Sequence, residues 1–172
     1  MRTDGTDRTD LSEHGVGEWS QPAWSPNGQL IYHIRHVSPL TGKPDIFAMT
    51  RQGGDPVRLT RGNDSHTDPH CSPDGRQILL TIQSGNGGFP QIWSMRTDGS
   101  QLTQLTRRGA ESACWSPDGT RIAYAAVNPD VYSTSGGTLW ILDIVTGEEH
   151  QVTRGPEQTC DNLAVAAAGL GQ

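Results

Sequence analysis

The chain has 172 residues, a formal net charge of -6 and only 33% apolar residues, with 21 glycines and 11 prolines. This length suits one domain, and the acidic balance argues against a nucleic-acid-binding protein, whose phosphate contacts need basic patches. No segment approaches the roughly 18 consecutive apolar residues of a membrane span, and short apolar runs among frequent turn residues favour an all-β chain.

The first 20 residues are predicted to lie outside the first complete repeat unit. The polar start MRTDGTDRTD contains no apolar signal-peptide core, so the cellular compartment is left open. The stretch MRTDGTDRTDLSE at Met1–Glu13 aligns with MRTDGSQLTQLTR at Met95–Arg107. Residues 1–20 are therefore expected to be the outer strand of a preceding unit followed by a linker, and the chain is expected to be a piece of a longer protein.

A first complete unit is predicted over residues 21–67. It contains the phrase AWSPNG, strand-like runs at Gln29–Ile34 and Pro44–Thr50, a glycine turn, and VRLTRG at Val57–Gly62. In Ser-Pro-Asn-Gly, serine favours the first position of a type I turn, proline presets φ at the second, and glycine accepts the positive φ that follows. The flanking runs are rich in β-branched and aromatic residues and have the length of strands. The unit therefore predicts four short antiparallel strands joined by hairpins.

The same phrases return in two further units, predicted over residues 68–111 and 112–159. HCSPDG and CWSPDG repeat the turn, QILLTI and RIAYAAV the strand after it, and QIWSM and LWILD the third strand. The turn prolines Pro26, Pro73 and Pro117 are separated by 47 and 44 residues. We assign the other in-phase motif residues a structural role: Trp24, Gly28, Asp74, Gly75, Trp115, Asp118 and Gly119. The motif tryptophans are predicted to lie in the core between units.

A four-stranded unit repeated every 40–50 residues is typical of a β-propeller blade, because blades stacked around an axis bury each other's apolar faces. Residues 160–172 lack the turn phrase and are predicted to be the inner strand of a truncated blade or a disordered tail. Three blades fall short of the roughly 280 residues that a six-blade ring needs at this period. We therefore predict an open arc, whose exposed blade faces offer surfaces for self-association.

The pattern WSPDG…RIAY…LWILD…G…QVT of the third unit resembles the repeat of TolB-like propellers. The resemblance covers about residues 20–159, and it departs from the family pattern where Cys71 replaces the motif tryptophan. It implies a propeller fold. The family includes periplasmic scaffold proteins, propellers attached to serine peptidases, and oligogalacturonate lyases, and its members are often exported.

The stretch NDSHTDPHCSPDG brings His66, Asp68 and His70 close together in sequence. The resemblance implies a metal interpretation, because histidines entering the inner strands of oligogalacturonate lyases hold a metal, and His70 occupies a corresponding position. His66 and His70 are therefore the metal candidates. The first and third units supply no further histidine for such a metal, because Ala23 and Cys114 occupy the positions that match His70. The favoured interpretation is a surface or capping role without a metal.

Exposed loops are the expected binding elements of such a fold. The binding-loop candidates are His66, Asp68, His70 and, in a long hairpin connection, Tyr132. The sequence contains no Gly-x-Ser-x-Gly elbow and no phosphate loop with its lysine, so no catalytic residue and no cofactor is assigned. We expect a non-enzymatic protein-binding or scaffold module that belongs to a larger propeller, with the partner unknown. The alternative is a fragment of a propeller enzyme, either oligogalacturonate-lyase-like or peptidase-associated.

Overall fold

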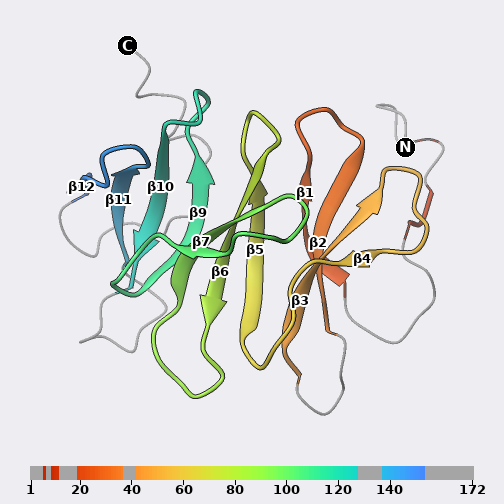
Figure 1. Ribbon diagram of the computed structural model, residues 1–172, viewed down its shortest axis with the longest axis horizontal. Coiled ribbons are helices and arrows are strands. Elements are labelled where there is room, and N and C mark those ends of the chain that lie inside the picture. The colour runs from red at the N-terminus through yellow and green to blue at the C-terminus, as the bar shows by residue number, and fades with distance from the viewer. Residues whose placement is uncertain (1–5, 7–8, 12–18, 37–41, 128–136, 154–172) are drawn as a thin grey trace.

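The computed structural model describes residues 6, 9–11, 19–36, 42–127 and 137–153, and they form three four-stranded antiparallel sheets (Figure 1). The first sheet contains β1 (Trp19–Trp24), β2 (Leu30–His36), β3 (Pro44–Thr50) and β4 (Val57–Arg58). The second contains β5 (Ser65–Cys71), β6 (Gln77–Gln83), β7 (Gln91–Arg96) and β8 (Thr103–Gln104). The third contains β9 (Ala110–Trp115), β10 (Arg121–Ala126), β11 (Thr138–Asp143) and β12 (Glu149–Gln151). The all-β prediction is confirmed.

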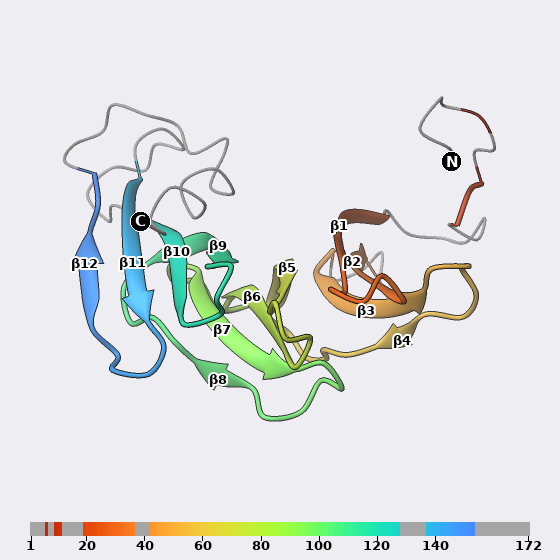
Figure 2. The same cartoon turned by 90° about the horizontal axis from the view of Figure 1, so that it is seen from above.

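The three sheets are blades of an open fan. Figure 2 shows β1, β5 and β9 converging at the inner edge, with β4, β8 and β12 at the outer edge. Within each sheet, hydrogen-bonded neighbours are consecutive in the chain. The predicted arc of propeller blades is confirmed. None of the described residues belongs to a helix long and apolar enough to cross a membrane.

The repeated Ser-Pro-Asp/Asn-Gly phrase closes the hairpin between the first two strands of every sheet. In the second sheet, the Gly75 N–H donates to the Ser72 carbonyl at 2.9 Å, and Gly75 adopts a φ of 72°. The Asp74 carboxylate accepts the Ser72 hydroxyl at 2.6 Å and the Arg76 N–H at 3.0 Å. The Ser72 hydroxyl in turn accepts the Gln77 N–H at 2.9 Å. The other two sheets repeat this set of bonds, so each letter of the phrase has a local hydrogen-bonding or conformational role.

The threonine of the third phrase ties the outer end of each sheet to the third strand. Its Oγ1 accepts a backbone N–H of that strand at 2.9 Å in all three sheets. The donor and acceptor pairs are Ile46 with Thr60, Ile92 with Thr106, and Leu139 with Thr153. Because the outer strands are only two or three residues long, this side-chain bond supplements a short ladder of backbone bonds.

Two hydrophobic cores fill the seams between the sheets. The seam between the first and second sheets contains Tyr32, Ile34, Ile46, Cys71, Ile78, Leu80, Ile82 and Met95. The seam between the second and third contains Leu79, Ile92, Ala110, Ala113, Trp115, Ile122, Tyr124 and Leu142. Alternate residues along β6 enter the two cores, as expected for a strand buried on both faces.

The two motif tryptophans have different surroundings. Trp115 is 7% exposed, and its Nε1 donates to the His70 carbonyl at 3.2 Å across the second seam. Trp24 occupies the matching position of the first sheet but is 59% exposed, because no described sheet lies against that side. The sequence predicts both rings as core between blades, and this must be corrected for Trp24.

The outward faces of the end blades expose less apolar surface than the sequence predicts. Ile31, Phe47 and Met49 point away from the first core, yet each is buried. Ile141 on the outward face of the third sheet is also buried. The apolar surface available for self-association at these ends is therefore smaller than a bare blade face.

Candidate functional site

The inner strands share an irregularity at the same point of each repeat. Gln21, Asp68 and Ser112 adopt φ values of 52°, 52° and 54°, and each lies five residues before the proline of its turn. The strand register shifts at the same places, so each inner strand contains a β-bulge. A left-handed conformation costs a non-glycine residue on the order of 1–2 kcal/mol. We call Gln21, Asp68 and Ser112 the inner-strand row.

The first two members of the row form a link between blades. The Gln21 Nε2 donates to the Asp68 Oδ1 at 2.7 Å, and the Asp68 N–H donates to the Gln21 Oε1 at 2.9 Å. One amide side chain thus satisfies both the carboxylate and the backbone of its neighbour. Burial raises the pKa of the Asp68 carboxyl, although hydrogen bonds from side chains such as Gln21 partly offset this effect. The arrangement presents polar groups along the inner edge of the arc.

The two histidines singled out from the sequence do not form one site. His66 is buried, and its Nδ1 lies 3.1 Å from the Asp45 Oδ1 of the first sheet. His70 is exposed, and its carbonyl is the acceptor for Trp115 described above. Within the described ranges, no three His, Cys, Asp or Glu side chains come together to hold a metal. Tyr132, the remaining binding-loop candidate, lies outside the described residues.

A buried polar cluster at the first seam was not predicted from the sequence. Asp45 on β3 contacts Arg58 on β4, and its Oδ1 accepts the Thr60 hydroxyl at 2.9 Å. Burial would raise the pKa of Asp45, but the interactions with His66, Thr60 and Arg58 outweigh it and lower the pKa. At the position of Asp45, the second unit has Gln91 and the third unit has Thr138. The sequence does contain a signal for this cluster, because Asp45 is charged whereas the matching residues of the other two units are neutral.

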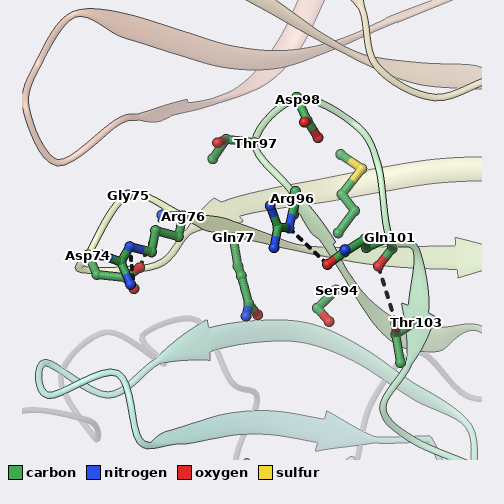
Figure 3. A pocket seen from close by; sticks show the side chains of 11 residues that line it. Asp74, Gly75, Arg76, Gln77, Ser94, Arg96, Thr97, Asp98, Gln101 and Thr103 are labelled. Carbon is green, nitrogen blue, oxygen red and sulfur yellow. Dashed lines mark hydrogen bonds and ion pairs between the residues drawn. The ribbon is translucent and has the colours of Figure 1, made fainter.

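An open groove of about 710 Å³ follows one rim of the second blade (Figure 3). It is lined by the motif turn at Asp74–Gln77 and by the β7–β8 connection. The Arg76 Nε lies 3.9 Å from the Asp74 Oδ2, and the Arg96 Nε donates to the Gln101 Oε1 at 2.8 Å. The lining is polar and its charges are balanced by groups of the same rim. This groove therefore concentrates neither charge nor apolar surface.

Comparison with known proteins gives a family match that covers most of the chain. A family model described as "TolB beta propeller domain" matches residues 4–161. The Tol-Pal system protein TolB of Anaeromyxobacter dehalogenans (strain 2CP-C) is 33% identical over 157 residues, which cover 91% of this chain and 35% of that protein. An uncharacterized protein of Agrobacterium fabrum, Atu1656, is 31% identical over 113 residues, which cover 63% of this chain and 36% of that protein.

Solved structures give the same result for the fold. A putative TolB from Agrobacterium tumefaciens matches with a TM-score of 0.70 and 26% identity, covering 84% of this chain and 52% of that one. An oligogalacturonate lyase in complex with manganese matches with a TM-score of 0.56 at 17% identity, covering 79% of this chain and 42% of that one. The chain spans only 35–36% of the length of the two curated relatives named above.

Proposed function

Because the chain belongs to the TolB β-propeller family, we propose that it is a non-enzymatic module that binds a protein partner as part of a larger propeller. The observation that supports this proposal is the inner-strand row. It places strained backbone and polar side chains at corresponding points of three neighbouring strands. Strain of this kind is often found at binding sites, where surrounding structure maintains it.

The row offers groups suited to an extended segment of a partner protein. The Gln21 and Asp68 side chains are already ordered by their mutual hydrogen bonds, so little side-chain entropy is lost when a partner binds beside them. Ser112 is exposed and has a hydroxyl that can donate or accept. The related proteins are named Tol-Pal system protein TolB, and a name that places them in a system supports a protein rather than a small molecule as the partner.

Site-specific photo-cross-linking tests the proposal. A photoreactive residue replaces Ser112, and the matched control carries the same residue at Asp98 on the rim of Figure 3. We expect a saturable cross-link from position 112 to a protein of the source cell, identified by mass spectrometry, and none from position 98. Asp68→Lys should abolish the product, because it breaks the link to Gln21 and reverses the charge.

Two results would contradict this function. Cross-linking of equal yield from positions 112 and 98 would show that the inner edge of the arc has no particular affinity for a partner. Turnover of oligogalacturonate or of a peptide substrate by the purified chain, abolished by His70→Ala, would replace the proposal with the propeller-enzyme alternative. Substrate assays with the wild-type chain and this variant therefore accompany the cross-linking.

A further inference from the structure

The connection between the third and outer strands differs in one sheet. In the second sheet, this connection packs closely against the first sheet. A Cβ at Gly99 would lie only 2.8 Å from the Leu59 carbonyl oxygen. In the first sheet, a Cβ at Gly53 would lie 3.6 Å from the Leu11 Cδ2. A Cβ at Gly147 of the third sheet would meet no atom within 4 Å. At Gly147, the connection in the third sheet therefore leaves a gap to the blade before it.

One additional residue in the turn explains this difference. The Gly99 N–H donates to Arg96, three residues earlier, whereas the Gly147 N–H donates to Asp143, four residues earlier. The Asp143 Oδ1 accepts the N–H of Val145 at 3.0 Å and thereby stabilises the longer turn. Val145 is 85% exposed as a result. The wider turn leaves a groove of about 500 Å³ between β8 and the β11–β12 connection.

The groove is lined by apolar side chains and by two arginines, together with Asp143 and Glu149. Leu105 and Ile144, both half-buried, contribute apolar surface, and Arg107 and Arg108 border the groove. The Arg108 guanidinium lies 4.9 Å from the ring centroid of Trp140, which favours a defined position for this side chain. Among the described residues, neither arginine forms an ion pair with a carboxylate.

The acidic groups of the groove already have partners. The Asp143 carboxylate accepts N–H groups of its own turn, and these bonds lower its pKa. Glu149 interacts with the hydroxyl of the buried Tyr124, whose pKa is raised chiefly by burial and also by Glu149. Both carboxylates stay charged and balance the formal charge of the two arginines, but their oxygens are already engaged by these donors. The guanidinium N–H groups of Arg107 and Arg108 have no hydrogen-bond acceptor among the described residues, and they are therefore the charged groups of the groove left available to a ligand.

We propose that this groove binds an acidic peptide segment of a partner protein. The peptide places carboxylates against Arg107 and Arg108, and an aliphatic side chain between Leu105 and Ile144. Arginine suits this task because its planar fork can bind a carboxylate through two hydrogen bonds. The groove lies at the outer seam, apart from the inner-strand row, and its function is independent of that site.

Calorimetric titration tests the proposal with an acetylated pentapeptide that alternates glutamate and leucine. At low ionic strength we expect saturable binding with a dissociation constant below about 1 mM. Peptides with lysine in place of glutamate, or serine in place of leucine, should bind at least tenfold more weakly. The first control removes the charge complementarity and the second removes the apolar contact.

Three variants locate the binding. Arg107→Gln with Arg108→Gln should weaken binding at least tenfold, whereas Arg76→Gln with Arg96→Gln, which removes the same charge from the rim of Figure 3, should not. Deletion of Val145 gives the turn the length of its counterparts and should close the groove, with the same loss of binding. The two arginines are exposed, so their replacement tests the proposal even if the deletion variant fails to fold. No binding by the wild type, equal binding of the lysine peptide, or equal losses in both arginine pairs would overturn the proposal.

Discussion

Replacing Trp115 with alanine should destabilise the chain far more than the same change at Trp24. A tryptophan can bury up to roughly 250 Å², which corresponds to an upper bound of about 6 kcal/mol at 25 cal/mol per Å². Trp115 is 7% exposed and also donates a hydrogen bond to the second blade. Tryptophan-to-alanine changes in protein cores cost about 3–5 kcal/mol, and we expect Trp115→Ala to fall in this range.

Trp24 provides the matched control, because it occupies the same position of the repeat with 59% of its surface exposed. The buried part of its ring is on the order of 100 Å², which corresponds to an upper bound of about 2.5 kcal/mol, so Trp24→Ala should cost about 1–2.5 kcal/mol. Trp115→Phe keeps an aromatic ring in the seam and loses the hydrogen bond to the His70 carbonyl. This variant should cost about 1–2 kcal/mol, intermediate between the wild type and the alanine variant.

Urea denaturation followed by far-ultraviolet circular dichroism measures the free energy of unfolding without dependence on tryptophan emission. The midpoint should decrease in the order wild type, Trp115→Phe, Trp115→Ala. Equal losses for Trp24→Ala and Trp115→Ala would refute the argument, because they would show that the neighbouring blade contributes nothing to the burial of Trp115. A loss below about 1 kcal/mol for Trp115→Ala would reject its assignment to the core between blades.

Three further variants test the local interactions. Thr106→Val removes the acceptor of the Ile92 N–H and should lower the free energy of unfolding by about 1–3 kcal/mol in urea denaturation, because a buried donor loses its partner; a neutral effect would refute that role. Ser112→Gly relieves a φ of 54° and should raise the midpoint by the equivalent of up to about 1 kcal/mol, whereas a decrease would show that the bulge is not strained. The folded-state pKa of Asp45 is lowered, so its contribution to stability is present above its ordinary value of 3.8 and is lost as the pH falls through the lower folded value. Urea midpoints measured across this acidic range should therefore fall less steeply with decreasing pH in Asp45→Asn than in the wild type, and parallel curves would contradict this.

The strands and motif turns could be predicted because their causes are local. Ser72, Asp74 and Gly75 satisfy one another within a few residues, and these letters therefore specify the hairpin wherever they occur. The exposure of Trp24 could not be predicted, because it depends on what lies beside the first blade rather than on the repeat itself.

The inner-strand row was hidden for a different reason. A positive φ is usually indicated by glycine, but the bulges contain glutamine, aspartate and serine, so the repeated backbone conformation has no repeated letter. Asp68 was singled out from the sequence for its proximity to histidines, whereas the structure links it to Gln21, 47 residues away. Contacts between blades require the register of two sheets, which the spacing of motifs within one unit does not provide.

The consecutive order of strands in each sheet also has an evolutionary consequence. Every blade is encoded by one continuous stretch of sequence, and every motif turn is stabilised within its own hairpin. Duplication or loss of one stretch therefore changes the number of blades without altering any strand pairing in the others. Only the seam residues must then adapt to a new neighbour. The Asp45 cluster at one seam, and the longer turn at the next, show how neighbouring copies of one unit can diverge at their contacts while the shared hairpins stay the same.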